Sequence, residues 1–535
     1  MFTDPTHAYG TPGVPETEHT SPDVLIIGAG PTGLTAACEA VRHGLTVRVI
    51  DRKPHRSTFS KALVVHARTM EIFETMGIAD RILAEGTRFT ALNVNTPRRR
   101  PVRVDLIGLP WGDTAYPFWL SVPQYATERV LEAHLTDRGH QVEWGVELKE
   151  VHDEGSGVQA TLQHADGTYE VVRARWLIGC DGGRSRTREA AGLRLDRSDA
   201  GATFVLADVM TTAALAEDEG HVHLAPEGLL LIVPMPEPGR WRIIAHDPGA
   251  QRKEAPTVDA AFLDDLIRRR SGIAFGSHHV TWTSRFRLSH GVADHYRRGR
   301  VFLAGDAAHV HSPVGGQGLN TGVQDAHNLM WKLAAAGRAV DGADGLLDSY
   351  EAERRPVAHA MVRGTARATG ALTTRKGIPR ALLGMVAPTL LTRASVRTRF
   401  GRGVGMLDIA YAGGESADGD RTPFAVGRRL PNPLLRGGGR LHQHLSPRGF
   451  TWVARGRAGE EHPGPDDPRW SGVPVVFLPD TRLVDPPAPA EAAPVVLVRP
   501  DRHIAATGRT VTSVLSAEPT PMVLCATGSS SLRRP

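Results

Sequence analysis

The stretch "DVLIIGAGPTGLTAACEAVRHGLTVRVIDR", residues 23–52, decides the fold of this chain. Its apolar run Val24 to Ile27 is typical of a strand buried on both faces, a helical stretch follows, and residues 46–50 make the next strand. Strand, helix and strand in this order form a βαβ unit, the building block of parallel sheets. We therefore expect an α/β fold that opens with a Rossmann-like nucleotide-binding unit.

Three glycines and one acidic residue give this unit the features of a dinucleotide site. Gly28 permits a tight turn, Gly30 lets the backbone approach a pyrophosphate, and Gly33 allows the helix to pack closely on the strand. The N–H groups at the helix start would face the phosphates. Asp51 ends the second strand, where an acid binds a ribose hydroxyl. The motif predicts one bound dinucleotide and leaves NAD and FAD open.

Composition and charge narrow the class of protein. The 535 residues include 63 basic and 58 acidic side chains, and the basic residues form only short clusters, which argues against nucleic-acid binding. Three cysteines without a CxxC pair fit a reducing compartment. The polar, proline-rich residues 1–21 lack the apolar stretch of a secretory signal, and no apolar run is long enough to span a bilayer. We expect a disordered tail and a cytoplasmic protein without membrane contacts.

The rest of the chain predicts two further domains. Residues 201–290 alternate as antiparallel strands do, as in "GLLLIVPM" (228–235) and "RWRIIAH" (240–246), and with residues 91–120 they form an inserted sheet domain. The nucleotide-binding domain is then discontinuous, over residues 22–90, 121–200 and 291–375. Past residue 400 the composition shifts to Gly, Pro and Arg, with three strand candidates, which predicts a separate C-terminal domain over residues 400–535.

Five motifs in one order make the chain resemble a known family. They are "GAGPTG" (28–33), "FSKALVVHARTMEIFE" (59–74), "PQYATERVL" (123–131), "CDGGRS" (180–185) and "AGDAAHVHSPVGGQGLN" (304–320). The chain resembles the class A, single-component FAD-dependent aromatic hydroxylases typified by para-hydroxybenzoate hydroxylase, and more closely their larger bacterial members. This resemblance implies FAD in a GR2-type domain, an inserted substrate-binding domain and a thioredoxin-like C-terminal domain without CxxC.

The motif at 304–320 would complete the flavin site. The resemblance implies that Asp306, after Gly305, accepts hydrogen bonds from the ribityl chain, and that the backbone carbonyl of Pro313 lies beside the flavin ring. Gly318, Leu319 and Asn320 would open a helix whose N–H groups face the ring edge that becomes negative on reduction. The alternative is a strand-end turn followed by a glycine loop.

Three other residues are assigned to the cofactor by the same resemblance. Asp181 belongs to a motif used for both FAD and NAD(P)H, and Gln124 matches a flavin contact. Lys61 stands where relatives usually carry an arginine near the pyrophosphate, and a lysine keeps the charge but loses the planar fork. Arg129 has two interpretations, a contact with the cofactor phosphates or an ion pair with Glu128 or Glu132.

His309 and His311 do not predict a metal site, because zinc needs three or four ligands and no cluster with ligand spacing accompanies them. The resemblance implies a monooxygenase that uses transient NAD(P)H and O2 to hydroxylate a phenolic or polyketide-type aromatic compound through a flavin C4a-hydroperoxide. Baeyer–Villiger oxygen insertion on a polyketide ketone is the first alternative, and a non-catalytic flavin-binding protein is the second. The C-terminal domain would serve stability or the contacts of a homodimer.

Overall fold

A computed structural model describes residues 21–59, 61–97, 100–249, 256–312, 315–339, 343–373, 394–411, 424–435, 438–455, 473–478 and 495–508. The predicted tail up to residue 20 and the Pro313 carbonyl lie outside the described residues.

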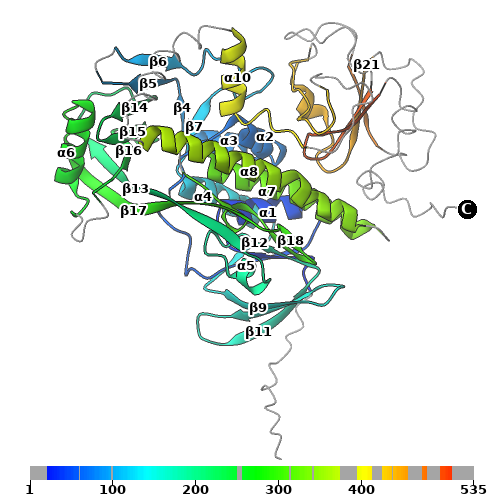
Figure 1. Cartoon of the computed structure of the whole chain (residues 1–535). Coiled ribbons are helices and arrows are strands. Elements are labelled where there is room, and N and C mark those ends of the chain that lie inside the picture. Colours follow the sequence, from blue (N-terminus) through cyan, green and yellow to red (C-terminus); the bar gives the residue numbers. More distant parts are fainter. Residues whose placement is uncertain are drawn as a thin grey trace, which may run out of the picture.

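A mainly parallel sheet lies at the centre of the described chain, in the strand order β18-β19-β12-β1-β2-β8 (Figure 1). All four residues of β1 are buried, because the strand pairs on both sides and both sheet faces are covered. This confirms the predicted opening strand. The strands are β1 (Val24–Ile27), β2 (Val47–Asp51), β8 (Val142–Trp144), β12 (Trp176–Gly179), β18 (Arg297–Arg298) and β19 (Val301–Leu303).

The two faces of this sheet have different covers. On one face, Val24 and Ile26 pack into the core formed with helices α1, α4 and α7; on the other, Leu25 and Ile27 pack against an antiparallel three-stranded sheet. In that small sheet β10 and β11 form an antiparallel hairpin. The elements are α1 (Pro31–Arg42), α4 (Gln124–Thr136), α7 (Gln317–Arg338), β9 (Glu147–Asp153), β10 (Val158–Gln163) and β11 (Tyr169–Ala174).

A second large sheet has the order β20-β17-β13-β16-β15-β14-β5-β6, and all its pairs are antiparallel except β14 with β5. Its strands alternate between two cores, and α6 (Ala260–Ser271) covers one of them. The strands predicted at 228–235 and 240–246 are β15 and β16. The eight strands are β5 (Ala91–Asn95), β6 (Val102–Asp105), β13 (Leu195–Thr211), β14 (Glu219–Ala225), β15 (Gly228–Pro234), β16 (Arg240–His246), β17 (Ser277–Ala293) and β20 (His309–Val310).

Smaller elements connect the two large sheets and form the C-terminal region. The connecting elements are β3 (Val64–Val65), α2 (Ala67–Thr75), α3 (Ala79–Ala84), β4 (Thr87–Phe89), β7 (Trp119–Ser121) and α5 (Arg186–Ala190). The C-terminal ones are α10 (Ala394–Val404), β21 (Thr451–Arg455), β22 (Val475–Leu478), β23 (Val495–Val498) and β24 (Ile504–Gly508). Strands occur at all three C-terminal candidates; the thioredoxin-like assignment and the domain limits stay predictions.

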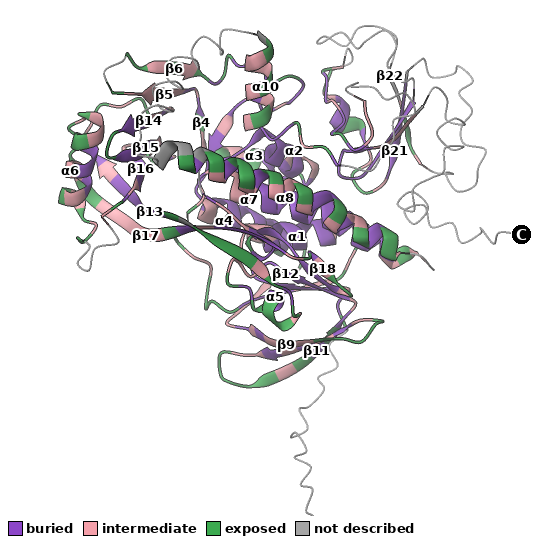
Figure 2. Cartoon of the chain, viewed as in Figure 1, coloured by how far each residue is buried: buried purple, intermediate pink, exposed green. Residues whose placement is uncertain are grey.

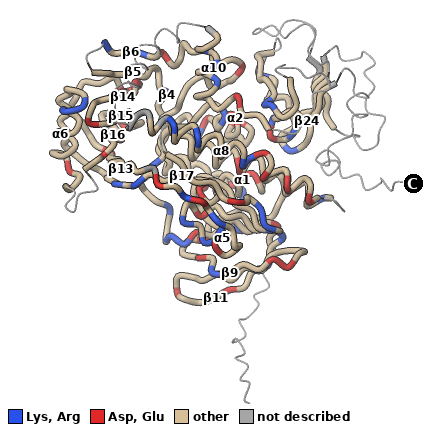
Figure 3. Tube along the Cα trace, viewed as in Figure 1, with Lys and Arg blue, Asp and Glu red and all other residues tan. Residues whose placement is uncertain are grey.

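Two long helices run beside each other through the molecule. α7 is buried from Asn320 to Ala336, as the purple ribbon in Figure 2 shows, while α8 (Asp344–Thr373) packs over it. Basic and acidic residues are interspersed along the described trace (Figure 3). Within the described part of the chain, helices long and apolar enough to cross a membrane are absent.

Candidate functional site

A large cavity of about 710 Å³ opens at the carboxyl ends of the parallel strands. It begins beside Ile27, Asp51 and Cys180, at the ends of β1, β2 and β12, and continues to the inner face of the eight-stranded sheet. Ligands of open α/β sheets bind at this edge. The volume is in the range of cofactor and ligand sites.

The turn between β1 and α1 is closed by glycines. Gly28 has a φ of +104°, and a Cβ there would lie 2.5 Å from the carbonyl oxygen of Cys180. A Cβ at Gly33 would lie 1.8 Å from the carbonyl oxygen of Gly28. The backbone therefore takes this turn only without side chains at these two positions.

Gly30 has open space beside it instead. A Cβ at Gly30 would meet no atom within 4 Å, and the residue lines the cavity. No side chain caps the first turn of α1, whereas Ser185 and Asp259 cap α5 and α6. The first N–H groups of α1 are thus left for a ligand, and this space beside an uncapped helix start fits the pyrophosphate of a dinucleotide such as FAD.

Asp51 lines the same end of the cavity and is almost fully buried. Its carboxylate accepts backbone hydrogen bonds from Ala29 (2.8 Å) and Lys53 (2.9 Å). These two bonds hold the carboxylate beside the β1–α1 turn. Each oxygen keeps a lone pair for a further donor, as the predicted ribose contact requires.

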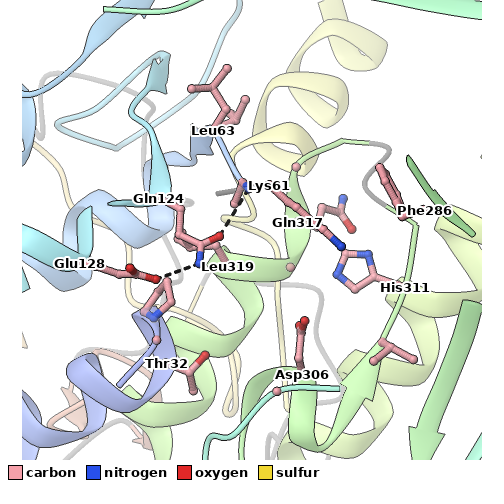
Figure 4. Close-up of a pocket in the computed structure, with 18 of the residues that line it drawn as sticks. Thr32, Lys61, Leu63, Gln124, Glu128, Phe286, Asp306, His311, Gln317 and Leu319 are labelled. Atoms are coloured by element: carbon pink, nitrogen blue, oxygen red, sulfur yellow. Dashed lines mark hydrogen bonds between the residues drawn. The ribbon is translucent and has the colours of Figure 1, made fainter. Parts of the chain in front are cut away.

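Asp306 lies in a short 3-10 helix, η1 (Gly305–Ala307), directly after β19. Its side chain is exposed and lines the cavity, and it has no hydrogen-bond partner among the described residues. Figure 4 shows it on the cavity floor. A free carboxylate in this position can accept hydrogen bonds from a polyol such as the ribityl chain.

A buried ion cluster under η1 holds Asp306 in place. Gly305 does not line the cavity; its N–H donates to Asp325 at 3.1 Å. Asp325 also accepts from Nε2 of His309 (2.8 Å) and Nε of Arg354 (2.7 Å). Burial raises the pKa of Asp325, but Arg354 and His309 outweigh it and lower that pKa, so the carboxylate stays charged. His309 therefore makes a specific buried hydrogen bond.

The start of α7 forms another wall of the cavity. Gly318 and Leu319 line it, and no side chain caps this helix, which follows Gly316 with φ +63°. Asn320 does not line the cavity. Its amide donates to the carbonyls of Val64 (2.8 Å) and Gly316 (2.7 Å), so Asn320 fixes the helix start against β3.

The backbone at Lys61 and Ala62 is held by two side chains, those of Gln124 and Arg242. The N–H of Ala62 donates to Oε1 of Gln124 at 3.4 Å, while Nη1 of Arg242 donates to the carbonyls of Lys61 (3.0 Å) and Ala62 (3.2 Å). The Lys61 ammonium lies 4.9 Å from the ring centroid of Phe286, on the side of the eight-stranded sheet. The Lys61 side chain therefore extends to the half of the cavity that lies against the eight-stranded sheet.

Arg242 is itself fixed by a buried ion pair. Its Nε and Nη2 contact the two carboxylate oxygens of Asp208 at 2.7 and 2.8 Å, and both side chains are buried. The sequence does not single out either residue. Both strands contain other charged residues as well, so the sequence carries no local signal for this pair.

Glu128 lines the cavity, although the sequence does not assign it to the cofactor site. Nε2 of Gln124 donates to it at 2.8 Å, the contact drawn in Figure 4. Burial raises the pKa of Glu128 to about 7, although the hydrogen bond from Gln124 opposes that rise. The cavity thus contains a carboxyl group that titrates near neutral pH.

Two other predicted residues have structural partners. Asp181 lines the cavity, and its carboxylate accepts from Ser185 (2.5 Å) and from the N–H of Thr187 (3.0 Å) at the start of α5. Arg129 forms an ion pair with Glu85 in place of the predicted pair with Glu128 or Glu132, and it does not line the cavity. Among the described residues, no cluster of three or more His, Cys, Asp or Glu could hold a metal.

The far half of the cavity is apolar. On β15, Leu229, Leu231 and Val233 line it, while Leu230 and Ile232 face the core under α6, as strand alternation requires. This wall is mainly hydrophobic, with His221, Arg287 and Ser289 as its polar members from the same sheet, and it is joined to the polar half without a break. The other apolar residues that line it are Phe89, Leu92, Trp119, Val222, Ile244, Phe286 and Leu288.

Comparisons with known proteins agree with this geometry. Residues 21–365 match the model of the FAD binding domain family. The chain is 42% identical over 363 residues to 6-methylpretetramide 4-monooxygenase of Streptomyces rimosus, a match that spans 68% of this chain and 64% of that protein. It is 35% identical over 497 residues to rifampicin monooxygenase of Rhodococcus hoagii, spanning 90% and 94%.

The fold is also shared with a solved structure. OxyS, an anhydrotetracycline hydroxylase from Streptomyces rimosus, superposes with a TM-score of 0.75 at 30% identity, covering 95% of this chain and 99% of that one. The chain belongs to the FAD-binding domain family and is an FAD-dependent flavoprotein monooxygenase.

Proposed function

We propose that this enzyme uses NAD(P)H and O2 to hydroxylate an aromatic compound of phenolic or polyketide type. One observation carries the proposal: a single cavity joins the dinucleotide end at Gly28 and Gly30 to a mainly apolar wall on the eight-stranded sheet. The names of the relatives, which include a pretetramide and an anhydrotetracycline enzyme, support the substrate class.

The predicted residues would each bind a different part of FAD. Gly28, Gly30 and the start of α1 would hold the pyrophosphate, Asp51 a ribose hydroxyl, and Asp306 the ribityl chain. The N–H groups at Gly318 and Leu319 would face the ring. Further contacts are proposed for Lys61, Gln124, Asp181 and the Pro313 carbonyl, whereas Gly33, Gly305 and Asn320 would support the cofactor site from behind. When bound, FAD supplies the electron-transfer and oxygen-transfer chemistry.

The apolar wall would exclude water and orient the substrate ring. Two polar residues, His311 and Lys61, would contact a substrate hydroxyl. Figure 4 shows His311 and Phe286 on one side of the cavity, opposite Gln124 and Glu128. Nδ1 of His311 lies 2.7 Å from the Ser312 carbonyl, so it donates there and leaves Nε2 to accept. Burial lowers the pKa of His311 to about 4, so the ring is neutral at pH 7. Lys61 would favour an anionic oxygen beside it.

The test is a panel of phenols and polyketide aromatics, scored for stimulated NAD(P)H oxidation and for product. A product with one new hydroxyl group supports the proposal. A new ester or lactone would show Baeyer–Villiger insertion instead. A purified protein that is colourless and cannot be reconstituted with FAD would refute both.

The apolar half can be tested separately with Leu231→Trp. Leu231 faces the cavity, so an indole there would fill the substrate space and abolish substrate-stimulated NAD(P)H oxidation while FAD stays bound. Val171→Trp is the matched control, because Val171 is exposed on β11. Equal stimulation in both variants would place the substrate elsewhere.

We also propose a homodimer, a cytoplasmic location and the domain limits given above. Light scattering of the purified protein, cell fractionation and limited proteolysis test these three proposals in turn.

A further inference from the structure

Val404, the last residue of α10, contacts two parts of the cofactor cavity at once. Its carbonyl oxygen lies 2.9 Å from Nε1 of Trp119 and 2.5 Å from Nδ1 of His66. Trp119 lines the cavity directly, whereas His66 is buried behind it. Val404 lies beyond residue 365, where the match to the FAD binding domain family ends.

His66 continues this connection into the loop before α7. Its Nε2 lies 3.0 Å from the carbonyl oxygen of Gly315, which lines the cavity. Its backbone N–H donates to Oδ1 of Asn320 at 2.9 Å, and its ring packs edge-on against Trp119 at 5.6 Å. One buried ring therefore contacts α10, the loop before α7 and Trp119.

The two ring nitrogens of His66 have the same kind of partner. Both face carbonyl oxygens, which only accept, and a neutral imidazole carries one N–H. Burial lowers the pKa of His66, against the opposing effect of these carbonyls, which favours the neutral ring. Only one ring nitrogen of the neutral His66 can donate. A hydrogen bond to the Gly315 carbonyl therefore competes with one to the Val404 carbonyl and depends on where that carbonyl lies.

The residues around Val404 are firmly anchored to α2. The carbonyl of Gly405 accepts the N–H of Arg68 in the first turn of α2. Arg429 contacts Glu71 on α2 at 2.5 Å and Asp113 at 2.9 Å, and all three side chains are buried. The C-terminal region is thus attached to α2 by a buried ion pair, which is costly to break.

We propose that the C-terminal region helps to shape the cofactor site, and that His66 is the positioning residue for this effect. Through its contact with His66, Val404 fixes the position of the loop before α7. The loop carries Gly315 and Gly316, and it leads directly into the helix start at Gly318 and Leu319. A shift of α10 would move this wall of the cavity although no residue of α10 lines it.

The test uses His66→Phe, which keeps a ring but removes both contacts, and His66→Gln, which restores one donor. His442→Phe is the matched control: His442 is also buried and contacts a backbone carbonyl, that of Leu430, at 2.9 Å, but it does not line the cavity. Two readouts are needed, the FAD dissociation constant and amide exchange at residues 315–320 in the cofactor-free protein.

We expect His66→Phe to weaken FAD binding at least tenfold and to speed exchange at 315–320, with His66→Gln between it and the parent. His442→Phe should lower the melting temperature without either effect. FAD affinity and exchange that change equally in His66→Phe and His442→Phe would reduce His66 to a general stability role and overturn the proposal.

A second pair of variants perturbs α10 from outside the cavity and serves if His66→Phe fails to fold. A Cβ at Gly405 would lie 3.1 Å from Trp111 and 3.3 Å from Ala67, so Gly405→Ala displaces the segment slightly, whereas a Cβ at Gly403 meets nothing within 4 Å. Gly405→Ala should weaken FAD binding and Gly403→Ala should not. Unchanged exchange at 315–320 in Gly405→Ala would overturn the coupling.

Discussion

Gly30 and Gly33 belong to one motif, but their surroundings are opposite. At Gly33 any side chain would strike the carbonyl of Gly28, so its role is packing. At Gly30 the missing side chain leaves room in the cavity. Substitution at Gly33 should therefore damage the fold, and substitution at Gly30 should damage the site.

Gly30→Ala should weaken FAD binding at least tenfold without lowering the melting temperature of the cofactor-free protein, because the new methyl group would occupy ligand space. Gly364→Ala on α8 is the control, since a Cβ there also meets nothing within 4 Å. It should leave FAD affinity unchanged and add up to about 1 kcal/mol of stability. Equal FAD affinity in Gly30→Ala and the parent would remove Gly30 from the site.

Glu128 should make stability depend on pH near neutrality. Its pKa in the folded protein is about 7, above its ordinary 4.5, because it is buried. Between these values the unfolded chain ionises first, so this group lowers the free energy of unfolding as pH rises from about 4.5 to about 7, with no further change above.

Glu128→Gln should therefore gain stability over the parent as pH rises through this window, measured as the difference in melting temperature at pH 5, 6, 7 and 8. Glu132→Gln, on the same helix and paired with Arg56 in the parent, is the control. A difference for Glu128→Gln that is constant across the four pH values would contradict the assignment.

At the scale of elements, Arg242 joins the eight-stranded sheet to the segment at residues 61–62 beside the cavity, and its ion pair with Asp208 lies within that sheet. Arg242→Met would leave the buried Asp208 with only the more distant Arg240, at 3.8 Å, which should destabilise the protein by up to about 3–5 kcal/mol. Arg242→Met combined with Asp208→Leu should recover much of this loss, yet amide exchange at residues 61–65 should stay fast because the donor to the Lys61 and Ala62 carbonyls is gone.

Arg285→Met is the matched control for the ion pair. Arg285 pairs with Asp247 at 2.9 Å on the same sheet but is more exposed, and it does not reach the segment. It should have a smaller effect on stability and none on exchange at 61–65. A double variant with normal exchange there would show that Arg242 does not hold the segment.

At the scale of the whole molecule, the C-terminal region should be sensitive to acid. Burial would raise the pKa of Glu71 and Glu353, but Arg429 and Arg499, respectively, outweigh it and help lower each value to about 2. A lowered pKa gives stability that is present above about 4.5 and lost as pH falls towards 2.

The free energy of unfolding should therefore fall between pH 5 and pH 3, and the loss should be smaller in the double variant Glu71→Gln with Glu353→Gln. Glu150→Gln, on the exposed part of β9, should keep the slope of the parent. Denaturant unfolding at both pH values measures the difference. The same slope in all three proteins would exclude these two carboxylates as its source.

Much of the fold follows from local patterns. Four apolar residues before "GAGPTG" predict the buried strand β1, and alternation predicts β15 and β16, because each pattern reflects the burial of one element. The motif residues Asp51, Gln124, Asp181, Asp306, Gly318 and Leu319 all line the cavity. Gly33 supports the cavity from behind, as its place in the motif predicts, and Gly305 and Asn320 do so as well, which no spacing in the sequence reveals.

By itself, the sequence determined the class of fold, the dinucleotide end of the cavity and the family, since these depend on short runs of residues with fixed spacing. Only the tertiary structure decided which side chains hold that site in place. Arg242 reaches Lys61 across 181 residues of chain, and His66 reaches Val404 across 338. Such contacts form only when distant segments pack together, so a buried arginine or histidine has no local pattern that names its partner.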